Sequence, residues 1–293
     1  MDLSRGDDSI VVMLGDVSVY LFNSFREKYP GRFYNMGICE NTLISAAAGL
    51  SSQGFVPFVH TIAPFITERS YEQIKLDMSY NQFGGNIVSC GASFDYAWDG
   101  ATHHSYTDLV ILRLLPGMEV VQPGSNKELD VLLRSQYNNG NPTYFRLTEH
   151  PHDIDLPVEF GKGVIIKDLG ADITIMTAGP ILENVIEACD DLDVNLVYFH
   201  TIKPIDKVVI NKFADTRILV VHDAFGLYEA ISEVPNLRTS YHGLQDKFYC
   251  SYGTPQDIRK EIGLDVEGIR DEITRNLNLN CVEHQKTLDG KDR

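Results

Sequence analysis

Short apolar runs alternate with helical patterns along almost the whole chain of 293 residues. Runs rich in β-branched residues are typical of buried strands, and amphipathic stretches between them are typical of helices. In the first half, the expected strands are 9–14, 56–59, 86–90, 119–121 and 143–147, and the expected helices are 41–53, 65–81, 105–115 and 126–137. This alternation predicts a doubly wound, mostly parallel α/β sheet covered by helices.

A second series of the same kind follows a polar, proline-containing stretch at 148–163, which has the composition of a linker. Its expected strands are 164–167, 172–176, 195–199 and 217–222, and its expected helices are 181–190, 206–213, 226–233 and 255–262. We therefore expect two doubly wound domains, at 1–150 and 164–279. A linker at 151–163 joins them, and a polar, aperiodic tail is expected at 280–293.

Charge and cysteine usage argue against several classes of protein. The net charge is −16 and the pI is about 4.9, whereas nucleic-acid partners require basic surfaces. The five cysteines are scattered and none has C-x-x-C spacing, so neither a zinc site nor a disulfide framework is indicated. No apolar run reaches the roughly 18 residues of a membrane span, and acidic residues interrupt the N-terminus where a signal peptide would be apolar. We expect a cytoplasmic protein without a metal site of its own.

One carboxylate stands at the mouth of a helix that is rich in small and apolar residues. Glu40 lies in the segment GICENTLISAAAGL at 37–50, near the carboxyl edge of the predicted sheet. Open α/β sheets bind their ligands at this edge. A carboxylate at the first turn of a helix also interacts favourably with the helix dipole. From the residues alone, Glu40 therefore either caps its helix or binds a ligand.

The segment 37–50 resembles the pyrimidine-binding domain of thiamine-diphosphate enzymes of the transketolase family, whose pattern is G-I-x-E followed by A-A-G-L. In that family the matching glutamate hydrogen-bonds the aminopyrimidine ring of the cofactor. The carboxyl supports the imino tautomer, in which the exocyclic nitrogen of the cofactor is basic enough to deprotonate its own thiazolium carbon. The resemblance thus implies that Glu40 binds thiamine diphosphate and is catalytic.

Three further positions near the cofactor are implied by the same resemblance. The segment FVHTIAPFITERSYEQI at 58–74 resembles the family's T-F-x-x-F segment, whose rings stack on the aminopyrimidine. Phe65 matches the second ring, and Ile62 replaces the first with an apolar wall. Asp16, in LGDVSVY, matches an acidic position that borders the cofactor. His60 stands where the family has a small residue, and it either faces the substrate or hydrogen-bonds a backbone group.

The segment WDGATHH at 98–104 resembles the family's E-D-G-x-T-H-Q loop. The resemblance implies that Asp99 and His103 bind substrate hydroxyls beside the reactive carbon, a task that suits an imidazole near neutral pH. It also matches Arg146 with an arginine that grips the substrate phosphate through its planar fork. A second phosphate ligand of the family, a histidine, is replaced by Gly91. The implied substrate is a small, non-standard sugar.

The second half of the chain resembles the C-terminal domain that transketolases share with 2-oxoacid dehydrogenase beta subunits. DLGADITIMTAGP at 168–180 and TIKPID at 201–206 carry this likeness. In the family this domain serves dimerisation, so we expect self-association through it. The Gly-Asp-Gly…Asn motif that anchors the diphosphate through magnesium was not found. The resemblance therefore implies an N-terminal partner subunit that holds most of the Mg²⁺ site, in an assembly of two copies of each chain.

These features favour the C-terminal subunit of a split transketolase, which transfers a two-carbon ketol unit from a ketose to an aldose. Two related enzymes remain open, a deoxyxylulose-phosphate-synthase-like one and a 2-oxoacid-dehydrogenase-beta-like one. A non-catalytic scaffold subunit is the third alternative. Ile62 and Gly91 depart from the family pattern and favour the scaffold, whereas the retained Glu40, Asp99 and His103 favour the enzyme.

Overall fold

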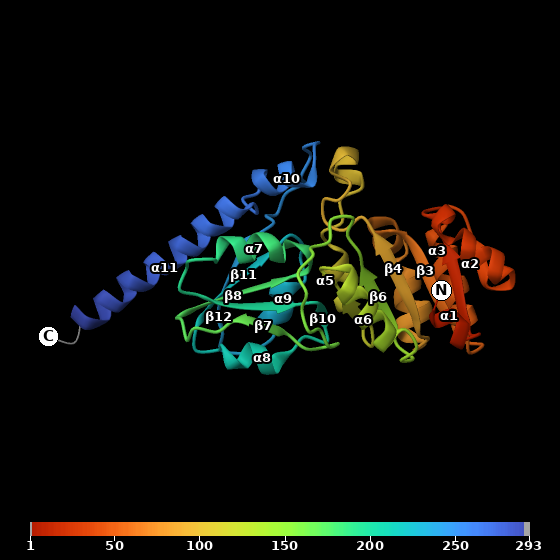
Figure 1. The fold of residues 1–293 in the computed structure, drawn as a ribbon, viewed down its shortest axis with the longest axis horizontal. Coiled ribbons are helices and arrows are strands. Elements are labelled where there is room, and N and C mark those ends of the chain that lie inside the picture. Colours follow the sequence, from red (N-terminus) through yellow and green to blue (C-terminus); the bar gives the residue numbers. More distant parts are fainter. Residues whose placement is uncertain (1, 290–293) are drawn as a thin grey trace.

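The computed structural model describes the backbone of residues 2–289 and the side chains of residues 2–278. Its strands form two sheets that lie side by side, with helices packed around them (Figure 1). Each sheet is parallel except for one edge strand, which confirms the predicted doubly wound, mostly parallel α/β fold. Within the described residues, no helix is both long enough and apolar enough to cross a membrane.

The first sheet has seven strands in the order β10-β5-β6-β4-β3-β1-β2. The strands are β1 (Ile10–Leu14), β2 (Phe33–Asn35), β3 (Val56–Ile62), β4 (Gly85–Cys90), β5 (Glu119–Val121), β6 (Pro142–Arg146) and β10 (Thr201–Lys203). All five residues of β1 are buried, because helices cover both faces of a parallel sheet. Its uninterrupted apolar run is the pattern from which the strand was predicted.

Strand β10 comes from the second half of the chain but completes the first sheet. It pairs antiparallel with β5, with Thr201 opposite Val121. The ammonium group of Lys203 donates to the backbone oxygens of Arg113 and Leu115, at the end of a helix of the first domain. The T-I-K-P-I-D segment therefore ties the two domains together.

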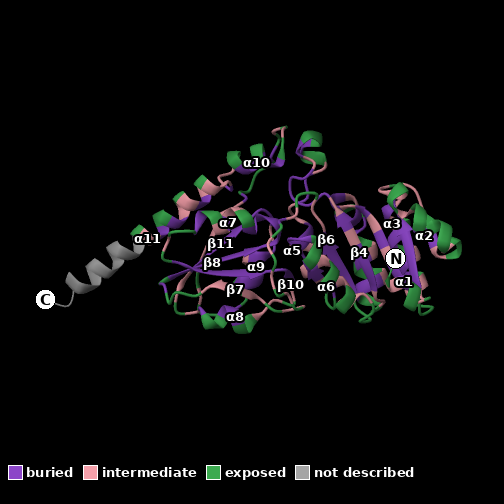
Figure 2. Cartoon of the chain, viewed as in Figure 1, coloured by how far each residue is buried: buried purple, intermediate pink, exposed green. Residues whose placement is uncertain are grey.

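The second sheet has five strands in the order β12-β11-β8-β9-β7. They are β7 (Val164–Lys167), β8 (Ile173–Ala178), β9 (Asn195–Phe199), β11 (Arg217–His222) and β12 (Arg238–Gly243). A hydrophobic core runs without interruption from the first sheet to the second, since Val120 and Tyr144 belong to the same cluster as Met176 and Phe199. Figure 2 shows buried residues concentrated in the strands and exposed residues on the outer helices.

Helices form in all the ranges where the alternation predicted them, and α1, α2 and α11 are additional. The α-helices are α1 (Leu3–Gly6), α2 (Asn23–Lys28), α3 (Glu40–Ser51), α4 (Tyr71–Gln73), α5 (Asp108–Arg113), α6 (Asn126–Gln136), α7 (Leu182–Ala188), α8 (Lys207–Lys212), α9 (Leu227–Ser232), α10 (Pro255–Glu261) and α11 (Val266–Asp289). The expected helix at 65–81 has an unusual form, because Phe65–Arg69 and Ile74–Tyr80 are π-helical and flank α4. π-Helical turns occur frequently at functional sites.

The prediction of an aperiodic tail from residue 280 was wrong for its first ten residues, since α11 continues to Asp289 and projects away from the domains (Figure 1). Residues 290–293 lie outside the described part. The first half of α11 is anchored because Ile269 and Ile273 are fully buried in the second core. Once a helix is nucleated, each added residue costs little, and α11 contains neither proline nor a glycine after Gly268 to end it.

Candidate active site

The buried carboxylate Glu40 is the first residue of α3 and is 1% exposed. Its Oε2 accepts a hydrogen bond from Nη1 of Arg69 at 2.7 Å. A carboxylate that only capped α3 would accept from N–H groups of its own first turn. The contact with Arg69 instead directs the carboxylate toward the π-helical segment, where the sequence placed the cofactor ring.

The side chain of Asn41 fixes α3 against this π-helical segment. Its Nδ2 donates to the backbone oxygen of Arg69 at 2.9 Å and to Oε1 of Gln73 at 2.8 Å. The guanidinium of Arg69 also lies over the ring of Phe65, 4.6 Å from the centroid. Arg69 therefore links the carboxylate to the aromatic side chain that was predicted to stack on the cofactor.

Phe65 in turn contacts the predicted substrate histidine. The rings of Phe65 and His103 meet edge to face, with centroids 5.2 Å apart. Glu40, Arg69, Phe65 and His103 thus form one continuous group, which we call the Glu40 cluster. The structure brings together three side chains that are far apart in the sequence and that were expected in one site.

The loop that carries Asp99 and His103 is held between the two domains. Gly100 has φ of 73°, and a Cβ there would lie 2.8 Å from the ring of Tyr252. A larger residue would therefore be disfavoured both by the backbone conformation and by the steric clash. Asp99 is exposed and His103 is half-buried. His104 points the other way, because it is 4% exposed and its ring packs against Phe94 with centroids 5.0 Å apart.

Two other expected residues lie at the same edge of the sheet. Asp16 follows β1 and is exposed, and its Oδ1 accepts from Nδ2 of Asn35 at 2.9 Å. His60, in β3, uses both ring nitrogens, with Nδ1 2.8 Å from the backbone oxygen of Val88 and Nε2 3.1 Å from Oγ of Ser18. Burial lowers the pKa of His60. Of the two alternatives for His60, the backbone hydrogen bond is the one observed.

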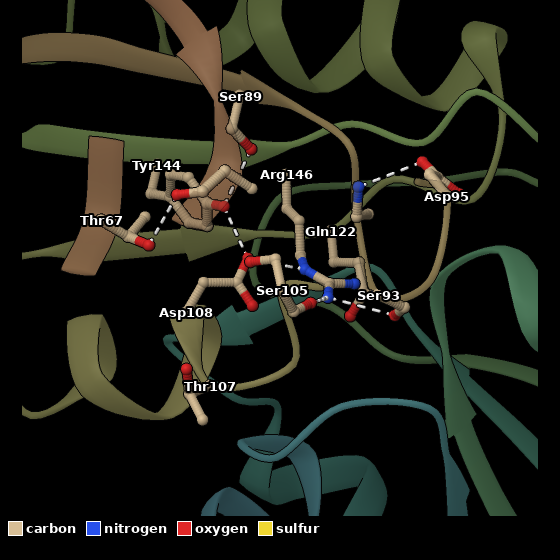
Figure 3. Close-up of polar contacts among 12 residues, drawn as sticks. Thr67, Ser89, Ser93, Asp95, Ser105, Thr107, Asp108, Gln122, Tyr144 and Arg146 are labelled. Atoms are coloured by element: carbon tan, nitrogen blue, oxygen red, sulfur yellow. Dashed lines mark hydrogen bonds and ion pairs between the residues drawn. The ribbon is translucent and has the colours of Figure 1, made fainter. Parts of the chain in front are cut away.

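The side chain of Arg146, which the resemblance assigned to a substrate phosphate, is buried in this structure and paired with a carboxylate. Its side chain and that of Asp108 are both 0% exposed, and its Nε donates to Oδ2 of Asp108 at 2.7 Å. Its Nη2 donates to Oγ of Ser93 at 3.1 Å and to the backbone oxygen of Ser105. Figure 3 shows the guanidinium pointing toward these partners. The sequence match did not anticipate Asp108 as a buried counter-charge.

Two side chains beside His103 were missed by the sequence analysis. The ring of Tyr96 has its centroid 6.5 Å from that of His103. Its hydroxyl donates to Oε1 of Glu149 at 2.7 Å, across 53 residues of sequence. No local spacing pattern could have paired them. Arg69 lies within the segment 58–74 that was compared with the family, but no role was assigned to it.

The residues of the Glu40 cluster fit an aminopyrimidine ring. A buried carboxylate is a suitable hydrogen-bond partner for a ring nitrogen, and half-buried Ile62 and Phe65 offer apolar walls. Among the residues that the structure describes, no three histidine, cysteine or acidic side chains are grouped so as to hold a metal ion.

Comparisons with known proteins identify the family of both halves of the chain. The family model for the transketolase pyrimidine binding domain matches residues 3–151, and that for the transketolase C-terminal domain matches residues 161–269. A putative transketolase C-terminal section from Methanocaldococcus jannaschii is 29% identical over 94% of this chain and 93% of its own length.

Two further relatives also match over almost their full length. One of the subunits of the apulose-4-phosphate transketolase of Phocaeicola vulgatus is 31% identical over 92% of both chains. A solved structure described as a split gene transketolase, inactive beta4 tetramer, superimposes with a TM-score of 0.84 at 28% identity, over 95% of both chains. The chain belongs to the transketolase family, and it corresponds to the C-terminal section of a transketolase.

Proposed function

We propose that this chain is the C-terminal subunit of a two-component transketolase, which transfers a two-carbon ketol unit from a ketose to an aldose. The observation that carries the proposal is the Glu40 cluster, in which a buried carboxylate, an aromatic ring and a histidine meet at one edge of the sheet. A scaffold subunit would have no need to keep these three groups in contact.

Each residue of the site has a distinct task in this proposal. Thiamine diphosphate, when bound, supplies the carbanion chemistry that breaks and forms the carbon–carbon bond. Glu40 holds a proton at a ring nitrogen of the cofactor, while Phe65 and Ile62 orient the ring. His103 and Asp99 bind the sugar hydroxyls next to the reacting carbon, and His103 can move a proton there. Asp16 borders the cofactor.

The proposed enzyme also requires a partner subunit. We expect an N-terminal subunit to hold the diphosphate and most of the Mg²⁺ ligands, in a heterotetramer of two copies of each chain. Support comes from two relatives that match almost end to end, one named as a C-terminal section and the other as one subunit of a transketolase. The beta4 tetramer described as inactive supports self-association of this chain without activity. We further expect a cytoplasmic enzyme of carbohydrate metabolism with no nucleic-acid partner, consistent with the charge of −16.

The test is reconstitution. Calorimetry with thiamine diphosphate and Mg²⁺ should show no tight binding to this chain alone, and tight binding to the complex with its N-terminal subunit. The complex should then transfer the ketol unit from hydroxypyruvate to an aldose, with a ketose as product. Tight cofactor binding by the isolated chain would contradict the partner proposal. Turnover of pyruvate in place of hydroxypyruvate would indicate the deoxyxylulose-phosphate-synthase-like alternative.

A further inference from the structure

We infer that Tyr96 and Glu149 form the end of the substrate site farthest from Glu40, and that they select sugars whose far end carries hydroxyls and no phosphate. This inference rests on the proposed function, because it names the substrate class of that same site. It is carried by a continuous row of side-chain contacts, by the packing of Tyr96 and by the charge around Glu149.

The row of contacts begins at the Glu40 cluster and continues beyond His103. Phe65 contacts His103, His103 faces the ring of Tyr96 at 6.5 Å, and the Tyr96 hydroxyl reaches Glu149 at 2.7 Å. A sugar with its reacting carbon near Glu40 and its hydroxyls on His103 would extend along this row. Its last carbons would then meet Tyr96 and Glu149.

Tyr96 occupies the space in which a larger residue at position 91 would lie. Gly91 has φ of 78°, and a Cβ built on it would be only 2.3 Å from Cε2 of Tyr96. Position 91 is where the family's phosphate-binding histidine was expected. A histidine and the Tyr96 ring cannot both fit in this arrangement, so the ring replaces that ligand with a neutral hydroxyl. Burial and the hydrogen bonds to Cys90 and Glu149 raise the pKa of Tyr96, which keeps it a donor.

Glu149 is held in place by a buried acid. Asp95 is 2% exposed, and its Oδ2 accepts from the backbone N–H of Glu149 at 2.8 Å. Its Oδ1 accepts from Oγ1 of Thr148 at 2.9 Å. The segment that follows β6 is thereby fixed to the loop that contains Tyr96. The side chain of Glu149 remains exposed, so its carboxylate can accept hydroxyl donors.

The charge beyond Glu149 is unfavourable for a phosphate. A pocket of about 390 Å³ opens there, and Glu149, Glu183 and Asp265 are among its lining residues, as is His150. Arg259 is the only lysine or arginine among the described lining residues, and it pairs with Asp223 at 3.2 Å.

Arg146 is likewise paired, with Asp108, and both of these side chains are buried. Among the described residues that line this end of the pocket, a phosphate dianion would face several carboxylates, while the one arginine is already paired. Sugar hydroxyls would instead find charge-assisted acceptors. The structure therefore favours an unphosphorylated sugar over its phosphate ester.

The experiment uses the complex with the N-terminal subunit, hydroxypyruvate as donor, and ribose or ribose 5-phosphate as acceptor. We expect wild type to have the higher kcat/KM with ribose. Glu149→Arg should raise kcat/KM for ribose 5-phosphate by roughly tenfold relative to ribose, since it places a charge-assisted donor where a carboxylate repelled the ester. Tyr96→Phe, which keeps the ring over Gly91, should weaken use of ribose with little change for its phosphate. Glu187→Arg, at an exposed position on α7, makes the same change of charge away from the row of contacts. It should leave the ratio of kcat/KM for ribose to kcat/KM for ribose 5-phosphate unchanged.

Binding provides a readout that does not depend on turnover. Calorimetry on the cofactor-loaded complex should show tighter binding of ribitol than of ribitol 5-phosphate, and Glu149→Arg should reverse the order. A preference of wild type for either phosphate ester, or no response of the ratio to Glu149→Arg, would overturn the inference while the proposed function stands. If the complex fails to transfer a ketol unit to any aldose but the ribitol preference holds, the proposed reaction fails and the selectivity remains.

Discussion

Replacing Arg146 should destabilise the fold rather than weaken substrate binding selectively. In Arg146→Met the carboxylate of Asp108 would stay fully enclosed without its cation, since both side chains are 0% exposed. Removing one partner of a buried ion pair costs about 3–5 kcal/mol. The Tyr144 hydroxyl, which donates to the same Oδ2 at 2.6 Å, would offset part of this loss. We therefore expect a loss near the lower limit, about 3 kcal/mol in the free energy of unfolding.

The measurement is urea unfolding of the chain at neutral pH, with the slope of the transition used to check that the same surface is exposed. The double variant Arg146→Met with Asp108→Leu should recover most of the loss, because replacing both partners of a buried pair with apolar groups is often neutral. Lys212→Met is the matched control. It breaks an ion pair of the same 2.7 Å length whose side chains are 51% and 39% exposed, and it should cost less than about 1 kcal/mol.

If Arg146→Met keeps the stability of wild type, and the complex loses affinity only for phosphorylated sugars, then Arg146 is a substrate ligand as its sequence match implied. An equal loss of kcat/KM for ribose and ribose 5-phosphate is the result we expect. Arg146 holds Ser93 and Ser105 at the base of the substrate loop, so its removal disturbs the loop for every substrate.

Three further predictions concern the site and the pH dependence. Glu40→Gln should abolish ketol transfer by the complex while its unfolding transition is kept; activity near wild type at saturating cofactor would contradict the assignment. His103→Ala and Asp99→Ala should lower kcat/KM with cofactor affinity nearly unchanged, measured by steady-state kinetics and calorimetry. Burial lowers the pKa of His200 and of His222 from 6.5 to about 4, so the unfolded chain binds more protons in this range. Stability should thus fall from pH 6.5 to pH 4, by up to about 3 kcal/mol per histidine, and His222→Gln should flatten the curve of unfolding midpoint against pH.

The parts of the fold that were predictable are those that bury apolar residues continuously. Strands β1 and β9 are buried at every position; β1 is an uninterrupted apolar run, and β9 is apolar after Asn195. Strand β12, with the sequence RTSYHG, has no buried position and therefore carries no apolar signal. Strand β10 has only three residues and takes its place from pairing with β5, which is decided by the packing of the two domains.

Some residues of the candidate site could likewise be placed from the sequence, and others could not. Glu40, Phe65 and His103 each stand in a short local motif, so a family resemblance could place them. The pairs Arg146–Asp108 and Tyr96–Glu149 join residues that are 38 and 53 positions apart, and only the packing of helices and loops around the sheet makes them neighbours. A single arginine at a strand end has the same sequence pattern whether it faces a ligand or a buried aspartate. Only the tertiary structure separates those two cases.

The contact between Glu40 and Arg69 bears on why a partner subunit would be needed. In this chain the guanidinium of Arg69 donates to Glu40 and lies over Phe65, which are two contacts that an aminopyrimidine ring would make in the proposed function. The side chain of Arg69 is 46% exposed, so it can move aside at modest cost. The ring would gain little by replacing contacts that are already satisfied. Most of the affinity for the cofactor must then come from its diphosphate, which the proposed function assigns to the partner.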